Sequence, residues 1–349
     1  MPPVAGQDRV LSERVLNRAL LARQLLLDRA SLPLPRAVER MGGIQTQYAP
    51  SAYVGLWSRL QGFEREALTR ALERRSLIQA TLMRNTIHIV SPRDYWPLVF
   101  AIRRGRMDWS RRIQKTETRE LERAAARLRE FLADGPRRQS EIVAALGADV
   151  WRPGIAIWVD LVRVPPSGTW QRRRADLFGL AEQWVGPAPE PSEDDALEHL
   201  VRRYLDAFGP ATATDLADWA GLKVGAIVPT LARLKLRRFL DERGRELVDL
   251  PRAPLPHPDT PAPVRFLPTW DATLLVHCRG TAILPEEYRP RIFHVKAPHS
   301  FSTFLVDGAV AGTWRYENGR VRLDPFKRLA RTARAELEEE GERLAAFHA

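Results

Sequence analysis

The sequence has very little cysteine and no long apolar run. Cys278 is the one cysteine among 349 residues, so no disulfide can form within the chain. The seven histidines are scattered and no Cys/His cluster has zinc-ligand spacing, so we expect no metal site. No segment approaches the roughly 18 apolar residues that span a bilayer, and the N-terminal residues mix charges of both signs without the apolar core of a signal peptide. These absences predict a soluble cytoplasmic protein without a membrane partner.

Positive charge is in excess. The 54 Lys and Arg residues outnumber the 43 Asp and Glu residues, which gives a formal net charge of +11. Such an excess is typical of proteins that neutralise phosphates, so nucleic acid is the leading partner class. The alternative is an arginine-rich composition that reflects a GC-rich genome, with no ligand for the surface arginines.

Two proline-rich segments, residues 186–195 and 250–264, read as linkers or surface crossings. Around them one pattern repeats, in which two short helices precede a hairpin. It appears as "SEIVAALG", "WRPGIAIWVDLV" and residues 163–185, again as "TDLADWAGL", "KVGAIVPTLARLK" and residues 236–250, and more loosely over residues 34–90. We therefore predict an α+β fold of three tandem winged helices, at residues 1–115, 116–190 and 191–252.

The second helix of each predicted unit carries few side chains that could read bases. A recognition helix presents Arg, Asn or Gln to base edges, whereas "GIAIWVDLV" is nearly all apolar and Pro229 lies inside "KVGAIVPTLARLK". A sequence-specific repressor is therefore the weaker interpretation, and winged helices also serve as protein-docking modules.

Residues 253–349 show strand patterns, followed by a helix. The expected strands are "VRFLPTW", "ATLLVHC", "FSTFLV", "AVAGTWRY" and "RVRL", with hairpin turns at Asp307-Gly308 and Asn318-Gly319. We expect a β-rich, barrel-like part closed by a charged helix over residues 327–347. A further helix is expected to begin at Ser91-Pro92.

The segment "GIQTQ" places Gln45 and Gln47 two residues apart. Residues i and i+2 share a face of an extended segment but not of a helix, and Gly42-Gly43 favours non-helical backbone here. Two convergent amides can orient a water, although they are weak bases that need an activated leaving group. The alternative is two solvated or capping amides.

Four segments in order resemble the winged-helix DNA glycosylase family represented by AlkZ and YcaQ, specifically its Gln-x-Gln subgroup. They are "MGGIQTQYAPSAYVGLWSRLQGF", "LMRNTIHIVSPRDYW", "FLPTWDATLLVHCRG" and "FLVDGAVAGTWR". The resemblance runs from about Leu11 to the final helix. It implies three winged helices and a β-rich part around a basic DNA channel, and excision of N-alkylated purines, including unhooking of interstrand crosslinks.

On this resemblance Gln45 and Gln47 are the catalytic pair. Candidate channel residues follow from the same segments: Arg84, His88, Trp270, Asp271 and His277. The chain departs from the family pattern at Thr46, where an aliphatic residue is usual, and at Arg279-Gly280, where an Asp-Arg pair is expected.

Several candidate residues have an equally simple structural interpretation. Arg84 and His88 suit either a DNA-facing surface or a hairpin tip, and His277 suits either the site or a buried core position. DNA contacts are predicted for two arginine clusters and one loop: Arg103, Arg104, Arg106, Arg111, Arg112 with Lys115, then Arg172, Arg173, Arg174, then His294, Lys296, His299. A solvated helix face is the alternative for the first cluster.

The sequence therefore predicts a monomeric, monofunctional glycosylase that acts on double-stranded DNA without metal or cofactor. No lysine lies beside the glutamine motif to form a Schiff base. The alternative is a non-catalytic winged-helix DNA-binding or regulatory protein, which would have no need of two convergent amides.

Overall fold

The computed structural model describes residues 9–114, 117–148, 150–151, 155–189, 192–294 and 299–349. Helices and small sheets alternate along the chain, and the ladders between named strands are antiparallel except for one parallel pair. The predicted mixed class of helices and antiparallel sheets is confirmed.

The first part of the chain is a helical unit with a hairpin. Its helices and strands are α1 (Glu13–Arg23), α2 (Leu34–Arg40), β2 (Ile44–Gln45), α3 (Ala49–Trp57), α4 (Arg65–Glu73), β3 (Ile78–Thr81), β4 (Ile87–Val90) and α5 (Pro92–Gln114). The Ser91 hydroxyl accepts from Asp94 N–H at 3.3 Å, so α5 begins as expected. Helix α3 is not among the helices expected from the sequence.

The second part joins the first through a shared sheet. It comprises α6 (Thr118–Phe131), β5 (Arg137–Arg138), α7 (Gln139–Leu146), β6 (Leu161–Arg163), β7 (Leu177–Leu180) and α8 (Ala181–Trp184). Strand β6 pairs with β3, which gives one six-stranded sheet in the order β2-β4-β3-β6-β7-β5. An antiparallel β6–β7 pair confirms the hairpin predicted over residues 163–185, although its end, residues 181–184, forms α8 and not strand.

The helix predicted from "WRPGIAIWVDLV" is wrong over its described residues. They form a 3₁₀ turn at Ile155–Ile157 and then strand β6. Pro153 and Gly154 are poor helix residues, and the free edge of β3 offers backbone partners to the apolar residues that follow.

The third part matches its predicted pattern closely. It comprises α9 (Glu193–Phe208), α10 (Ala213–Ala220), α11 (Val224–Arg233), β8 (Arg237–Asp241) and β9 (Glu246–Asp249). A Thr212–Asp215 capping box starts α10, and Gly221 ends it with φ +74°. Strand β1 (Val10–Leu11) adds to β8 in parallel.

The C-terminal part is an open sheet with a covering helix. Strands β10 (Arg265–Leu267), β13 (Thr303–Val306), β14 (Ala309–Glu317) and β15 (Arg320–Pro325) pair in that order, and α13 (Arg331–His348) packs against β15. The expected barrel is wrong, since β10 and β15 are edges. The expected strand "ATLLVHC" is also wrong, because Asp271 caps a 3₁₀ turn at Ala272–Leu274 that leads into another at Val276–Thr281.

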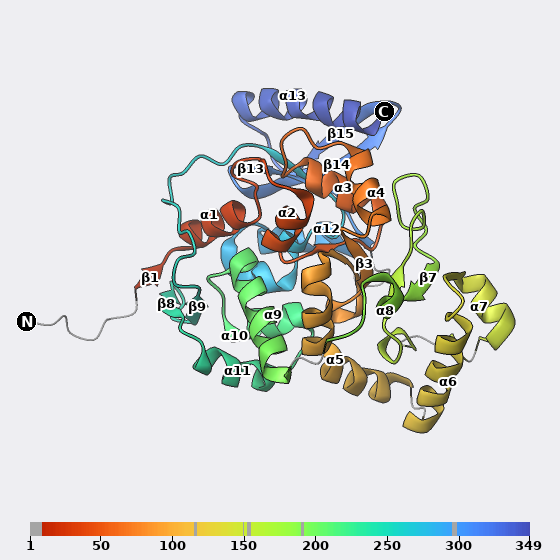
Figure 1. Ribbon diagram of the computed structural model, residues 1–349. Coiled ribbons are helices and arrows are strands. Elements are labelled where there is room, and N and C mark those ends of the chain that lie inside the picture. The colour runs from red at the N-terminus through yellow and green to blue at the C-terminus, as the bar shows by residue number, and fades with distance from the viewer. Residues whose placement is uncertain (1–8, 115–116, 149, 152–154, 190–191, 295–298) are drawn as a thin grey trace, which may run out of the picture.

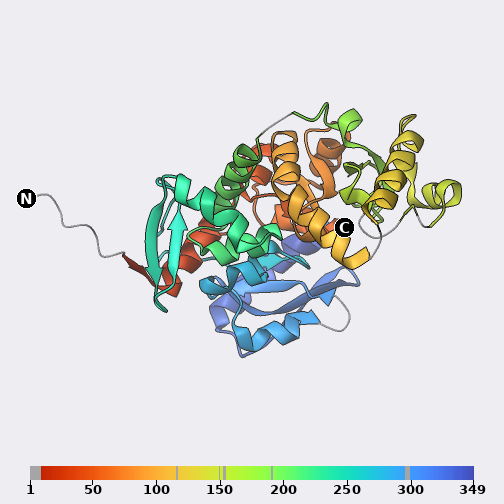
Figure 2. The same cartoon turned by 90° about the horizontal axis from the view of Figure 1, so that it is seen from below.

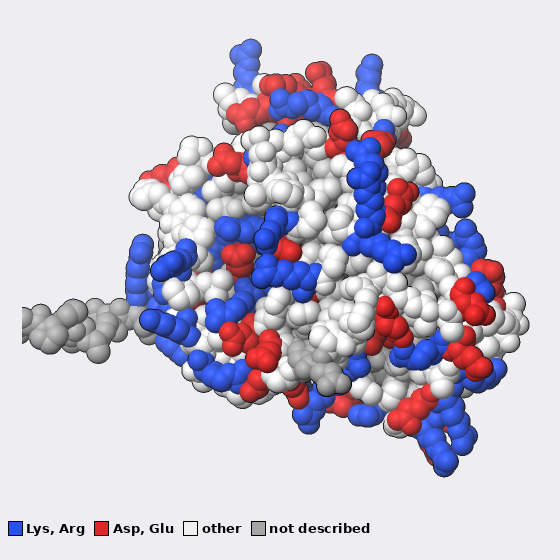
Figure 3. Space-filling model, viewed as in Figure 1, with Lys and Arg blue, Asp and Glu red and all other residues white. Residues whose placement is uncertain are grey.

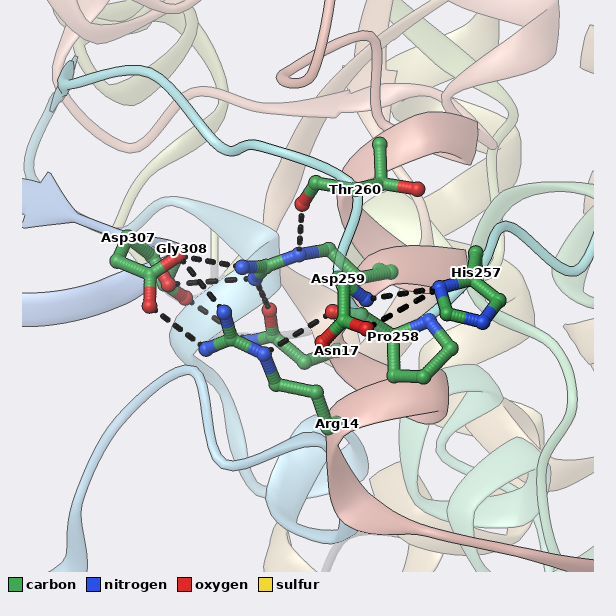
Figure 4. A network of polar contacts seen from close by, with 9 residues as sticks. Arg14, Asn17, His257, Pro258, Asp259, Thr260, Asp307 and Gly308 are labelled. Atoms are coloured by element: carbon green, nitrogen blue, oxygen red, sulfur yellow. Dashed lines mark hydrogen bonds and ion pairs between the residues drawn. The ribbon is translucent and has the colours of Figure 1, made fainter.

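The segment between β9 and β10, residues 250–264, contains no helix or strand and is held against α1 by polar contacts. Figure 4 shows Arg14 and Asn17 reaching the β13–β14 turn at Asp307-Gly308. Arg14 forms a two-point ion pair with Asp307 at 2.7 and 3.1 Å, and Arg18 donates to Thr260 O at 2.7 Å. These bonds tie three distant segments together.

Figure 1 shows α5 and α9 side by side near the middle of the molecule, and the two helices pack against each other. In Figure 2 the β8–β9 hairpin lies at one end, α6 and α7 lie at the other, and the C-terminal sheet runs along one side. The largest core includes residues of all four parts, whereas α6 and α7 share a separate core with other residues of β6 and β7. Division of the chain at residues 115, 190 and 252 stays a prediction.

Candidate active site

The glutamine motif is non-helical, as predicted: Gln45 lies in a short strand and Gln47 at the bend that follows it. Gln45 lies in β2 opposite His88 of β4, and Thr46 N–H continues the ladder by donating to Ile87 O at 2.8 Å. Gly42 and Gly43 lead into the strand with φ +72° and +87°. A Cβ at Gly43 would also come within 3.1 Å of Val90 Cγ1, so glycine suits this position in conformation and in space.

Both glutamine side chains are held through their carbonyl oxygens. Arg84 Nη2 donates to Gln45 Oε1 at 2.6 Å, and Ile87 N–H donates to Gln47 Oε1 at 2.7 Å. Gln45 is buried, whereas Gln47 is exposed. An amide oxygen has two lone pairs, so each oxygen keeps one acceptor site after these bonds. The motif therefore presents two fixed neutral amides, one of them open to solvent.

Arg84 lies in the β3–β4 turn, where Arg84 and Asn85 have φ of +53° and +58°. The turn packs against the end of α10: a Cβ at Gly221 would lie 3.1 Å from Arg84 N. Arg84 Nη1 donates to Trp219 O, in the last turn of α10, where carbonyl groups favour a cation. Burial lowers the pKa of Arg84 to about 10, although Cys278, Tyr204 and Asp218 oppose the shift. The guanidinium remains charged at neutral pH and joins the first part of the chain to the third.

His88 is a buried neutral histidine behind the motif. Burial, followed by the charge of Arg84, lowers its pKa to about 3. Nδ1 lies 3.0 Å from Thr86 O, and since a carbonyl oxygen only accepts, Nδ1 carries the proton. His88 is therefore a neutral hydrogen-bonding group at pH 7.

His277 is also buried, in a 3₁₀ turn and not in the expected strand. Burial, then Arg84 and His88, hold its pKa well below the usual range. Its ring packs edge-on against Phe208 at 4.8 Å, while Nε2 has no hydrogen-bond partner among the described residues. His277 therefore lies in the core behind Arg84, and its Nε2 is a buried polar atom.

Asp271 is a structural anchor next to the motif. It accepts from Arg59 Nη2 at 2.9 Å, in a pair buried on both sides, and from the Thr273 hydroxyl at 2.8 Å. Gln45, Gln24, Arg59 and Asp271 line a cavity of about 20 Å³, enough for a single water. Trp270 is half-buried, with φ +60° and its ring 5.9 Å from Phe293.

The arginines of α5 divide into two groups. Arg104, Arg111 and Arg112 are exposed, and Arg103 is half-buried with an ion pair to Asp160 at 2.8 Å. Arg106 is buried and donates through Nε to Asn85 Oδ1 at 3.0 Å. The DNA contact predicted for Arg106 is therefore wrong: this side chain supports the Arg84 turn. Lys115 lies outside the described residues.

Arg172, Arg173 and Arg174 are exposed in the connection between β6 and β7. Arg173 Nη1 donates to the Tyr48 hydroxyl at 2.8 Å, and Arg174 pairs with Asp176 at 3.1 Å. Arg173 of this connection thus reaches the residue that directly follows Gln47.

The predicted groove-probing loop is a hairpin of β11 (Phe293–His294) and β12 (His299–Ser300), in which His294 pairs with His299. Lys296 lies outside the described residues. At the departure from the family pattern, Arg279 is exposed and pairs with Glu286 at 3.3 Å.

Basic and acidic side chains are interspersed on the face of the molecule in Figure 3. Within the described residues, none of the helices combines the length and apolar character that a membrane span requires. In the described part of the chain, no group of three or more His, Cys, Asp or Glu side chains is arranged so that it could hold a metal ion.

Sequence reasoning missed Gln24, Arg59 and Tyr48. Gln24 Nε2 donates to Ala207 O at 3.0 Å, and Arg59 Nε donates to Gln24 O at the same distance, so both brace the cavity at Gln45. Only Tyr48 carried a signal in the sequence, which is its position directly after the motif.

Comparisons with known proteins agree over nearly the whole chain. The family model described as "DNA glycosylase AlkZ-like" matches residues 38–347. A Streptomyces sahachiroi protein named "Interstrand DNA cross-link repair glycosylase" is 24% identical over 359 residues, covering 93% of each chain. The solved structure of Streptomyces sahachiroi DNA glycosylase AlkZ has a TM-score of 0.81 at 20% identity, covering 97% of this chain and 98% of that one. At that identity the structural likeness shows the fold.

Proposed function

This chain belongs to the AlkZ-like DNA glycosylase family, enzymes that hydrolyse N-glycosyl bonds, and from that premise we propose that it excises N-alkylated purines from double-stranded DNA. The proposal includes purines joined in interstrand crosslinks, the lesion in the name of the Streptomyces sahachiroi relative. It also assigns Gln45 and Gln47 as the residues that position the attacking water.

The observation that carries the proposal is the fixed orientation of the two amides. Arg84 holds Gln45 Oε1 and the backbone of Ile87 holds Gln47 Oε1, so each oxygen can accept one O–H of a water with its remaining lone pair. The water then turns its own lone pair toward the anomeric carbon of the deoxyribose. Preorganised polar groups of this kind act without reorganisation during the reaction.

The chemistry needs no strong base. The water oxygen bonds to the anomeric carbon, the N-glycosidic bond breaks, and the bonding pair leaves with the cationic base, which becomes neutral. The proton of the water passes to solvent. His88 is neutral and buried, and a weak acceptor is sufficient because the leaving group is already activated. The product is an abasic site, since the reaction forms no covalent enzyme intermediate.

The test is excision by purified protein on two duplexes, one with N7-methylguanine and one with a nitrogen-mustard crosslink, each heated in alkali to break abasic sites. We expect strand breaks with the wild type and none above background with Gln45→Ala/Gln47→Ala, while DNA affinity stays within about twofold. The exposed Gln61→Ala serves as the matched control and should retain full activity.

Undiminished excision by the double variant would overturn the assignment of the motif. Tight, salt-sensitive binding without excision of either substrate would favour a non-catalytic DNA-binding protein. Borohydride trapping of a covalent protein–DNA complex would overturn the monofunctional mechanism.

A further inference from the structure

A pocket of about 340 Å³ opens beside the glutamine motif. Tyr48, which directly follows Gln47, forms part of its wall. Ser51 and Pro268 line both this pocket and the small cavity at Gln45, so the two spaces share a wall. The Ser51 hydroxyl is 2.8 Å from that of Thr269, which fixes the wall between α3 and the C-terminal part.

Aromatic rings dominate the lining. We call this space the aromatic pocket and define it by Tyr48, Trp170, Phe301, Trp314, Tyr316 and His348. Tyr48, Phe301 and Tyr316 are the three most exposed Phe, Tyr or Trp residues in the described part of the chain, at 45%, 39% and 37%. Exposed apolar surface gathered in one place marks a binding site. The volume falls in the range of small-molecule pockets.

The aromatic rings of the walls pack against neighbouring rings. Trp170 is buried and packs against Tyr53 and Phe347, with ring centroids 5.5 and 5.8 Å apart. The Tyr316 ring stacks on that of His348 at 4.4 Å and an angle of 17°. The pocket thus offers flat, preformed ring faces to a flat ligand.

Positive charge lies at the rim. Arg173, which donates to the Tyr48 hydroxyl, comes from the β6–β7 connection, and Arg315 comes from β14. Arg315 is largely exposed, at 68%, with Glu317 as its partner at 3.3 Å. Ring faces inside and guanidinium groups outside suit a nucleotide, whose base stacks while its phosphate meets the arginines.

We propose that the aromatic pocket receives an N-alkylated purine turned out of the duplex, and that it selects the cationic base through the faces of its rings. A cation over an aromatic face is attracted by the ring quadrupole, so an alkylated purine binds there better than the neutral base. The inference rests on the proposed alkylpurine activity and adds its recognition site. A base tethered to the opposite strand cannot enter, so crosslink unhooking does not use this pocket.

The first test measures binding without catalysis, by titration calorimetry of the full chain with 7-methylguanosine 5′-monophosphate and with GMP. We expect the methylated nucleotide to bind roughly 3- to 30-fold more tightly. Tyr316→Leu should abolish this preference, and Tyr316→Phe, which keeps the ring, should preserve it. Arg173→Gln should weaken both nucleotides, whereas Arg320→Gln at an exposed arginine of β15 outside the pocket should weaken neither.

The second test compares single-turnover excision on the two duplexes. Tyr316→Leu should slow release of N7-methylguanine by roughly 5- to 100-fold, the loss expected for one stacking partner, and leave crosslink unhooking within about twofold. Equal binding of the two nucleotides by the wild type would overturn the pocket assignment, and so would equal slowing of both substrates by Tyr316→Leu. In either case, excision by the wild type would still support the proposed function. If the protein preferred the methylated nucleotide but excised neither substrate, the pocket assignment would be supported and the proposed function overturned.

Discussion

Arg84 provides the sharpest test of how the motif is held, through the substitution Arg84→Gln. A pKa lowered from 12.5 to about 10 means that the fold disfavours the charged form of Arg84 by about 3 kcal/mol. The neutral glutamine carries no charge, so the variant avoids this cost. The substitution also removes the charge-assisted bonds to Gln45 and Trp219, each worth about 1.5–3 kcal/mol. The two effects nearly offset each other, so we expect stability to fall by no more than about 3 kcal/mol.

The rate of excision should fall, because removing the buried charge does nothing to replace the bond that holds Gln45. Loss of the donor frees Gln45 Oε1 to rotate, and a bond worth about 1.5–3 kcal/mol in the transition state corresponds to roughly 10- to 100-fold in rate. The assay is single-turnover release of N7-methylguanine, beside urea unfolding followed by circular dichroism. Arg75→Gln is the matched control, because Arg75 also has a positive φ, of 60°, but lies in the turn after α4, where it donates to Gln183 O and lies over the Trp184 ring.

Two further measurements separate a positioning role from a structural one. In the Gln45→Ala background, loss of Arg84 should add little to the defect, because coupled residues are non-additive. Excision by Arg84→Gln within twofold of the wild type would refute the positioning role. A stability loss above about 5 kcal/mol would refute the balance between burial of the charge and its bonds.

The remaining predictions concern pH and the buried ion pairs. Because the pKa of His88 is lower in the fold than in the unfolded chain, stability should decline as pH falls from about 6.5 toward 3, and His88→Gln should remove several kcal/mol of that decline in urea unfolding. Excision should be flat from about pH 6 to 8.5, because His88 titrates near 3 and Arg84 near 10; a bell-shaped profile centred near 7 would contradict a neutral site. Asp249→Asn should cost about 3–5 kcal/mol in urea unfolding, because it breaks the fully buried two-point pair with Arg23, at 2.8 and 2.9 Å; a loss below 1 kcal/mol would contradict this.

Local chemistry made much of the fold predictable. The non-helical motif after Gly42-Gly43, the turn at Arg84 and the Gly221 helix end all follow from residues within a few positions of one another. The predictions for two short apolar runs are wrong for a common reason. Periodicity cannot distinguish a buried strand from a buried turn or helix, so "ATLLVHC" and residues 151–162 were decided by the Asp271 cap and the β3 edge.

The candidate site was predictable only in part, because its geometry depends on contacts between distant segments. Nothing near Arg84 in sequence indicates that its partner is the end of α10, some 135 residues away. In the sequence Arg106 falls among the other arginines of residues 103–112, yet its position on α5 turns it inward to Asn85. Tyr48 and Tyr316 meet in one pocket only after the first part of the chain and the C-terminal sheet have packed together.

The parallel pairing of β1 with β8 has a consequence for synthesis of the protein. Val10 bonds in register with Leu240, about 230 residues later, so the N-terminal strand emerges from the ribosome long before its partner exists. At roughly 5–20 residues per second this interval is on the order of 10 to 50 seconds. During that time α1 also lacks the Asp249 carboxylate that Arg23 binds in the finished protein. The start of the chain is thus among the last segments to reach its native contacts, and a nascent chain stalled before β8 would expose that segment to chaperones.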